Sequence, residues 1–226
     1  GPLGYIVDNT YLKKIVFKEV LKSNFIKFMG GVNIKDVGDT SVSATIFSNK
    51  GNFSAPLIVG ADGRNSKIRF FANIKSFFYD YNQAAFVFNI SHTLSHHSKA
   101  LERFFPSGPL ALLPMQNNNK KSSSVVWTVD SQMKEKLLKS KNFYNEFEKK
   151  YAQAFGRITK TSRPAVYNLN VISCYEYFKK RIVLVGDACQ AIHPIAGQGL
   201  NLGLRDSYHL AKIISESLEL GLDIGS

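Results

Sequence analysis

The segment from Arg181 to Ala211 constrains the fold more than any other part of this chain. It opens with Ile182–Val185, an unbroken run of β-branched and aliphatic residues that is typical of a strand covered on both faces. Gly186 and the residue after it end the run. A glycine-rich loop then leads to a helical pattern from about Leu200. This succession of strand, turn, loop and helix start predicts a place where backbone N–H groups face an anionic or electron-rich ligand.

Several residue types in this segment suit a ligand site. A carboxylate at the end of a strand can accept hydrogen bonds from ligand hydroxyl groups. Glycines in the loop permit positive φ angles and close approach of the backbone. The N–H groups of a first helical turn have no partner within the helix. The candidate binding residues are therefore Gly186, Asp187, Pro194, Gly197, Gly199, Leu200 and Asn201.

A second apolar run also ends in an aspartate–glycine pair. Leu57–Val59 leads into Asp62 and Gly63, and a short helix is predicted from Ser66 to about Ala72. Taken alone, Asp62 is best explained as a helix N-cap. Because a similar turn follows the downstream strand, we favour a binding role for this one as well.

The composition excludes some classes of function. The formal charge is +12, from 29 Lys and Arg against 17 Asp and Glu, which favours acidic partners. The basic residues are scattered and lack interleaved aromatics, so we predict no nucleic-acid partner. The two cysteines have no metal-site spacing, so we predict no metal and a reducing compartment. Lys13-Lys14 and Lys179–Arg181 are predicted to be solvated, with contact to a membrane surface as the alternative.

The rest of the chain alternates between strands and helices. We predict a helix capped by Asn9 or Thr10 and a strand at Ile26–Met29. Further strands are predicted at 42–47, 53–59, 83–91, 110–113 and 125–129, and further helices at 131–139 and 142–155. Trp127 and most phenylalanines are predicted to be core, whereas His92, His96 and His97 are predicted to be solvated.

Three segments together resemble one known family. The sequence GDACQAIHPIAGQGLNLGLRD, residues 186–206, resembles the second flavin motif of the class A flavoprotein aromatic hydroxylases. It is especially similar to the ubiquinone-biosynthesis branch, and its Gln190 and His193-Pro194 are most similar to the 2-polyprenyl-6-methoxyphenol hydroxylases. Residues 61–69 resemble the Asp-Gly motif of the same family, with Ser66 and Arg69 at matching positions. Residues 102–115 are similar to its Gly-Pro-Leu-Ala segment.

The resemblance implies a mixed α/β fold. We expect part of a three-layer FAD/NAD(P)-binding domain with an inserted, mostly antiparallel β-sheet domain that binds substrate. The corresponding boundaries are 5–76 for the first part of the FAD-binding domain, 77–171 for the substrate domain and 172–226 for the return to the FAD-binding domain.

The resemblance also implies FAD and NAD(P)H as cofactors. It puts Asp187 at the ribityl chain, and Gly199, Leu200 and Asn201 near the pyrimidine edge of the isoalloxazine. It assigns Asp62, Gly63 and Arg69 to contacts with the FAD pyrophosphate and the nicotinamide cofactor. The flavin carries the chemistry in such enzymes, so no catalytic side chain is predicted. His193 is predicted to have a structural role in its loop.

The implied function is that of an FAD-dependent monooxygenase, which hydroxylates a polyprenylated phenol in ubiquinone biosynthesis through a flavin C4a-hydroperoxide. It would work in the cytoplasm or at the inner face of the membrane, as a peripheral protein or in contact with a biosynthetic complex. The alternatives are a class A hydroxylase of a soluble aromatic and a non-catalytic truncated or scaffold form. No Gly-x-Gly-x-x-Gly motif occurs here. We therefore expect the chain to begin downstream of that motif and, alone, to be inactive.

Overall fold

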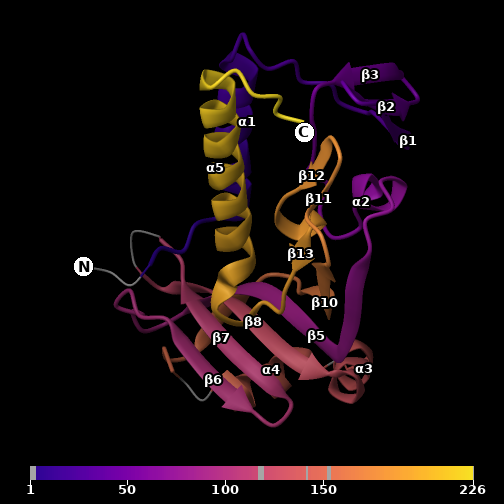
Figure 1. The fold of residues 1–226 in the computed structure, drawn as a ribbon. Coiled ribbons are helices and arrows are strands. Elements are labelled where there is room, and N and C mark those ends of the chain that lie inside the picture. The colour runs from indigo at the N-terminus through magenta and orange to yellow at the C-terminus, as the bar shows by residue number, and fades with distance from the viewer. Residues whose placement is uncertain (1–3, 117–119, 141, 152–153, 226) are drawn as a thin grey trace. The chain divides into compact units, whose positions relative to one another are not determined.

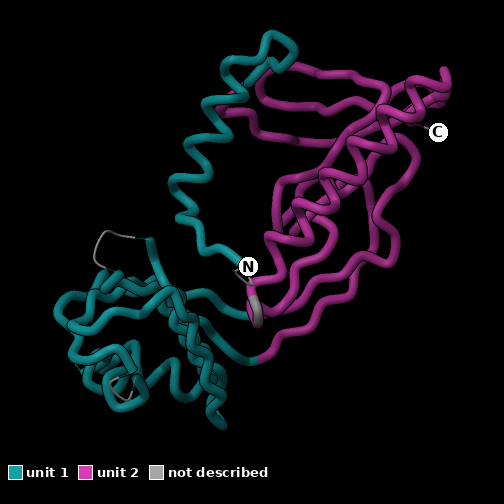
Figure 2. Tube along the Cα trace, turned by 90° about the vertical axis from the view of Figure 1, so that its left-hand side faces the viewer, with its two compact units in different colours: residues 1–28, 82–169 teal, residues 29–81, 170–226 magenta. Residues whose placement is uncertain are grey.

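The computed structural model describes residues 4–116, 120–140, 142–151 and 154–225 (Figure 1). The chain divides into two compact units, which Figure 2 shows in separate colours. Unit 1 comprises residues 1–28 and 82–169, and unit 2 comprises residues 29–81 and 170–226. The mixed α/β fold class predicted from the sequence is confirmed.

Unit 1 is built on antiparallel strands with two helices against one face of the sheet. Strand β8 pairs with β5 and β7, β7 pairs with β6, and β5 also pairs with β9, always antiparallel. The elements are α1 (Asn9–Lys22), β5 (Ser76–His92), β6 (Leu101–Phe105), β7 (Gly108–Pro114), β8 (Ser122–Asp130), α3 (Ser131–Lys139), α4 (Phe143–Tyr151) and β9 (Ile158–Thr161). The first residues of β5 belong to unit 2.

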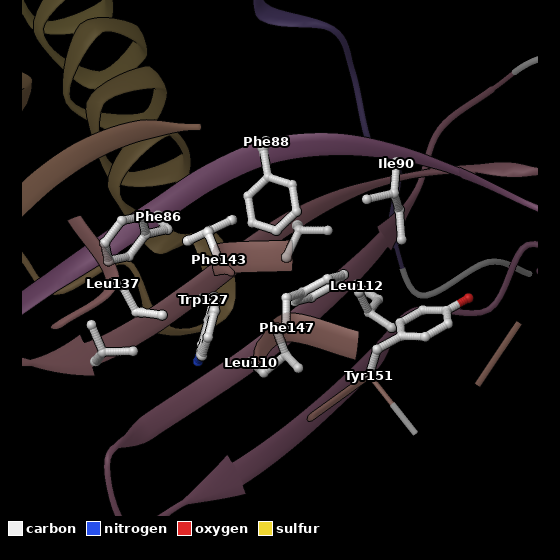
Figure 3. Packing of buried hydrophobic residues seen from close by; sticks show 12 residues of the cluster. Phe86, Phe88, Ile90, Leu110, Leu112, Trp127, Leu137, Phe143, Phe147 and Tyr151 are labelled. Atoms are coloured by element: carbon white, nitrogen blue, oxygen red, sulfur yellow. The ribbon is translucent and has the colours of Figure 1, made fainter. Parts of the chain in front are cut away.

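The core of unit 1 is aromatic and lies between the sheet and the two helices (Figure 3). Trp127 of β8 is fully buried, opposite Phe86 of β5 and Leu110 of β7 in the strand registers. Phe143 and Phe147 of α4 lie 5.7 and 6.0 Å from the Trp127 ring. Alternate strand residues thus face one layer of helix residues, as period-2 patterning requires. The predicted core role is confirmed for Trp127, but it is wrong for many phenylalanines, which are exposed in this structure.

Unit 2 contains two small sheets and the segments with the candidate binding residues. Strands β1 to β3 form an antiparallel sheet, and a second sheet has the order β11-β12-β4. The elements are β1 (Ile34–Asp39), β2 (Ala44–Ser48), β3 (Gly51–Ala55), β4 (Ile58–Gly60), α2 (Lys67–Phe71), β10 (Ala165–Cys174), β11 (Phe178–Lys179), β12 (Ile182–Leu184), the 3₁₀ turns η1 (Gly186–Ala188) and η2 (Ile195–Gly197), β13 (Gln190–Ala191) and α5 (Gln198–Glu219). Strand β10 begins in unit 1.

Some predicted elements are wrong in this structure. Ile26–Met29 is not a strand, because Ile26 and Phe28 are exposed and Phe28 instead meets Phe17 edge-on at 5.0 Å. The predicted strand over 53–59 is two strands, separated at Pro56, which has no N–H to donate. Strand β1 was not predicted, because its sequence IKDVGD is too polar to show a strand pattern. Helix α1 is capped by Asp8, one residue before the predicted caps.

The prediction that His92 and His96 are solvated is also wrong. Their side chains are 2% and 3% exposed. The His92 Nδ1 donates to the Leu94 carbonyl at 2.7 Å, and its Nε2 accepts from Ser123 Oγ at 3.0 Å. Burial lowers the pKa of His92. These hydrogen bonds satisfy both ring nitrogens, so that a neutral imidazole can be buried in unit 1.

Arg181 was predicted to be solvated with its neighbouring lysines, and it is instead 4% exposed. Its guanidinium donates to the carbonyls of Ser41 and Pro56, and it forms an ion pair with Asp223. This pairing lowers the pKa of Asp223 to about 2. Lys179 and Lys180 are exposed, as predicted. No helix in the described part of the chain is long and apolar enough to cross a membrane.

Candidate functional site

The two aspartate-containing turns lie at the same edge of one sheet in unit 2. Strands β4 and β12 are parallel neighbours, with Gly60 opposite Leu184. The Val185 N–H donates to the Gly60 carbonyl at 3.0 Å, which continues this pairing to the strand ends. The turn with Asp62 follows β4, and the turn with Asp187 follows β12. Ligand sites of open α/β sheets occur at such carboxyl ends of parallel strands.

The Asp62 carboxylate is used within the protein. It accepts hydrogen bonds from Ser66 Oγ at 2.5 Å, from the Lys67 N–H at 2.7 Å and from the Ile68 N–H at 3.2 Å. The Ser66 hydroxyl in turn caps α2 by accepting from the Arg69 N–H at 2.9 Å. Asp62 therefore satisfies N–H groups at the start of α2 that have no partner inside the helix.

Gly63 and Arg69 have different positions in the same turn. Gly63 has φ +80°, and a Cβ there would meet nothing within 4 Å, so its backbone is open to close approach. The Arg69 guanidinium donates through Nη1 to the Ala188 carbonyl and through Nη2 to the Arg64 carbonyl, both at 2.8 Å. Arg69 thus joins the turn after β4 to the turn after β12.

Asp187 differs from Asp62 because its carboxylate is exposed. It makes no hydrogen bond or ion pair with any residue that the structure describes. Gly186 before it has φ +58°, in the left-handed region that favours glycine. A 3₁₀ turn, η1, thus presents Asp187 with its acceptor oxygens available for a ligand.

The loop before α5 is exposed and glycine-rich. Gly197 has φ +61° and is the N-cap of α5, with no side chain capping the helix. A Cβ at Gly197 or Gly199 would meet nothing within 4 Å. Pro194, Leu200 and Asn201 are exposed around this helix start. Its first-turn N–H groups and the positive end of the helix dipole are therefore available to an electron-rich group.

His193 lies in this loop beside Tyr81, with ring centroids 5.1 Å apart. Its Nδ1 accepts a hydrogen bond from the Ile195 N–H at 3.3 Å. Burial lowers the pKa of His193, so the neutral ring that this hydrogen bond needs is favoured. The contacts fit the predicted structural role.

Sequence reasoning missed two residues on the face of α5 that meets η1. Asp206 accepts a hydrogen bond from the Gly186 N–H at 3.0 Å. Gly203, one helical turn earlier, has its backbone against Gly186, because a Cβ added at Gly203 would be 3.4 Å from the Gly186 Cα. Their spacing of three residues, which puts both on one helix face, was the available signal.

The two cysteines close to this site are buried and unreactive in character. Cys189 is 1% exposed, and burial together with the nearby Asp206 charge raises its pKa to about 12. Burial also raises the pKa of Cys174. Both thiols therefore stay protonated at neutral pH, and Cys189 acts as a small buried side chain that fills space.

The sequence of residues 25–220 matches the family described as FAD binding domain. The chain belongs to the FAD binding domain family. FAD is the cofactor of this family, and NAD(P)H is its usual reductant.

Several curated relatives of this FAD binding domain chain are named as hydroxylases or monooxygenases. It is 35% identical to ubiquinone hydroxylase UbiL of Rhodospirillum rubrum, over 100% of this chain and 53% of UbiL. It is 27% identical to the mitochondrial ubiquinone biosynthesis monooxygenase COQ6 of Dictyostelium discoideum, over 99% of this chain and 55% of COQ6. The predicted resemblance to ubiquinone-biosynthesis hydroxylases is confirmed. The chain spans about half the length of the curated relatives it matches.

Solved structures of flavin enzymes share the fold. The probable FAD-dependent monooxygenase PqsL of Pseudomonas aeruginosa has a TM-score of 0.75 at 19% identity, over 94% of this chain and 61% of PqsL. The p-nitrophenol 4-monooxygenase PnpA of Pseudomonas putida has a TM-score of 0.77 at 15% identity, over 95% of this chain and 55% of PnpA. At these identities the comparison shows the fold of this FAD binding domain alone.

Proposed function

We propose that the whole protein is an FAD-dependent hydroxylase of ubiquinone biosynthesis, with NAD(P)H as reductant and a polyprenylated phenol as substrate. One observation carries the proposal: the exposed carboxylate of Asp187 follows β12, and the uncapped, glycine-rich start of α5 follows it in the chain. The ubiquinone hydroxylase names of UbiL and COQ6 support the choice of reaction and substrate class.

The residues present fit one part of FAD. The oxygens of Asp187 suit the ribityl hydroxyls, because a carboxylate accepts several hydrogen bonds. Gly197 and Gly199 leave the space that a flat ring needs beside a backbone. The free N–H groups of the first turn of α5, up to that of Leu200 and just before Asn201, suit the electron-rich pyrimidine edge of the isoalloxazine.

The turn after β4 has an indirect role in this proposal. Asp62 and Arg69 are engaged in hydrogen bonds within the protein. They therefore hold the Gly63 backbone and join the two turns, and contact with the pyrophosphate or the nicotinamide falls to backbone groups near Gly63.

Bound FAD would supply the oxidising chemistry, which amino-acid side chains do not provide. The chain itself orients and stabilises. Asp187 fixes the ribityl chain and with it the ring, so that substrate meets the ring in one geometry. The positive end of α5 stabilises negative charge on the ring without reorganisation. Residues 77–171, in our proposal, hold the aromatic substrate away from water.

The test uses the whole protein, expressed in full from its gene. We expect it to purify with FAD absorbance, and to add one oxygen atom to a polyprenylated phenol when NAD(P)H and O₂ are supplied, as measured by mass spectrometry. Asp187→Ala is the control, which should purify with less FAD and form less product. Absence of flavin, or bound flavin without a hydroxylated product, would contradict the proposal. Turnover of a soluble phenol alone would favour a hydroxylase of soluble aromatics.

We also propose that the protein works in the cytoplasm at the inner face of the membrane. The apolar tail of a polyprenylated phenol is held in lipid, and a net charge of +12 favours an anionic surface. Sedimentation with vesicles of anionic and of neutral lipid tests this. Equal recovery with both kinds of vesicle at low salt would contradict it.

A further inference from the structure

Asp206 of α5 is hydrogen-bonded to the turn that carries Asp187. Its Oδ2 accepts from the Gly186 N–H at 3.0 Å. The same oxygen lies 4.0 Å from the Cys189 Sγ, at the other end of the turn. Asp206 is partly buried, in the third turn of its helix. One carboxylate oxygen therefore has donors from both sides of Asp187.

The backbones of η1 and α5 come close together at this point, with a Cβ at either glycine in van der Waals contact with the other. A Cβ added at Gly186 would lie 3.6 Å from the Gly203 Cα, and one added at Gly203 would lie 3.4 Å from the Gly186 Cα. Gly203 and Asp206 share one face of α5. The helix is thus joined to η1 by a contact between two glycines and by a charge-assisted hydrogen bond.

This attachment is one of the contacts that hold the backbone around Asp187, together with the hydrogen bonds from the Cys189 N–H to the Gly186 carbonyl and from Arg69 to the Ala188 carbonyl. Glycine has more backbone freedom than any other residue type. The φ of +58° at Gly186 is therefore fixed by contacts with the surrounding residues. Asp187 has no partner of its own among the described residues. Its direction therefore depends on the backbone conformation of Gly186, and Asp206 holds the N–H of that residue.

We propose that Asp206 is a positioning residue for cofactor binding, which fixes the turn so that Asp187 meets the ribityl hydroxyls. The inference rests on the proposed function, because it assigns that role to Asp187. Asp206 itself does not touch the cofactor in this proposal. It acts by removing the conformational freedom of the turn before binding, which lowers the entropy cost of binding.

The test is a double-mutant cycle on FAD affinity in the whole protein, with flavin fluorescence as readout. We expect Asp206→Ala to weaken FAD binding about tenfold, as for other hydrogen bonds to a charged group. Asp206→Asn keeps an acceptor oxygen and should stay within about threefold of wild type. Added to Asp187→Ala, the Asp206→Ala change should cost less than about twofold, because both act through one contact. Glu216→Ala, at an exposed position of α5, is the matched control.

Hydrogen exchange of the apoprotein gives a second readout. Asp206→Ala should speed exchange of the Gly186 amide, and Glu216→Ala should not. If the losses of FAD affinity from Asp187→Ala and Asp206→Ala multiply in the double mutant, the positioning role of Asp206 is overturned. An unchanged exchange rate of the Gly186 amide would also overturn it. Either result leaves the proposed contact of Asp187 with FAD in place. A wild-type protein that binds no FAD would overturn the proposed function, and the cofactor role of Asp206 with it.

Discussion

The turns after β4 and after β12 look alike in sequence and differ in what their aspartates do. Each follows a short apolar strand, and each contains an aspartate next to a glycine. Asp62 directs its oxygens to three donors at the start of α2. Asp187 is exposed and has no such donors in the described structure.

The difference follows from the position of the next helix. Helix α2 begins five residues after Asp62, close enough for its free N–H groups to reach the carboxylate. Asp187 lies within the 3₁₀ turn η1, β13 and η2 follow it, and α5 begins eleven residues after it. The first turn is therefore stabilised by its own helix, whereas the second leaves both a carboxylate and a helix start for a ligand. Four measurements test this contrast.

Gly60→Ala should have the largest effect, because it disturbs the base that both turns share. A Cβ at this position would lie 2.6 Å from Leu184 Cδ2 and 2.9 Å from Ile68 Cγ2. We expect a loss of about 2–3 kcal/mol in the free energy of unfolding, typical of overpacking, measured by urea denaturation. Gly199→Ala, where a Cβ meets nothing within 4 Å, is the control for stability. Equal stability of both variants would mean that Gly60 is not packed closely against Leu184 and Ile68.

Asp187→Ala should come next, and should act on binding alone. We expect FAD affinity to fall about thirtyfold, or about 2 kcal/mol, because ligand hydroxyls lose a charged acceptor. The midpoint of thermal unfolding without FAD should not change, since no described group depends on this side chain. A drop in that midpoint as large as the drop for Asp62→Ala would erase the contrast between the turns.

Asp62→Ala should act mainly on stability. Removing the acceptor leaves two backbone N–H groups and the Ser66 hydroxyl without their partner, which should cost about 1.5 kcal/mol in urea unfolding. Asp62→Asn keeps one acceptor oxygen and should recover part of this loss. FAD affinity should fall less than in Asp187→Ala. The reverse order of affinities would assign the direct contact to Asp62 instead.

The smallest effect concerns Cys189, two residues after Asp187. Its pKa is raised from 9.0 to about 12 by burial and by Asp206, so the folded state resists loss of the proton. The contribution of the protonated Cys189 thiol to the stability of the folded state is complete below pH 9 and is lost as pH rises from 9 towards 12. We expect the free energy of unfolding to fall by about 1 kcal/mol between pH 9 and pH 10. Cys189→Ser should flatten this slope, and an identical slope in the variant would mean that the thiol is not enclosed.

The two turns were predictable because their signals are local. Apolar runs at Ile58 and at Ile182–Val185, each stopped by glycine and aspartate, indicate strand ends from neighbouring residues alone. That the strands are parallel neighbours depends on pairing between residues 124 positions apart, which no local pattern in the sequence indicates. The direction of each carboxylate depends on which N–H groups come within reach, which a linear pattern does not encode.

The errors have the same physical origin. His92 is buried because Ser123, 31 residues away, supplies a hydroxyl to its ring. Ile26–Met29 has a strand-like composition, but no strand among the described residues pairs with it. Asp206 was missed because its partner is the backbone N–H of residue 186. Every residue type except proline has such an N–H, so the identity of residue 186 gives no signal. In each case, the deciding group lies far away in the sequence or has no side-chain signature.

The buried Arg181 has a consequence for the order of folding. Its partners Ser41, Pro56 and Asp223 are 140, 125 and 42 residues away along the chain. Closing such long loops costs entropy before any contact compensates it. A buried guanidinium is tolerable only when all its partners are present. We infer that the hydrogen bonds around the Arg181 guanidinium form late in folding. The segments around residues 41, 56 and 223 then reach the native state together or not at all.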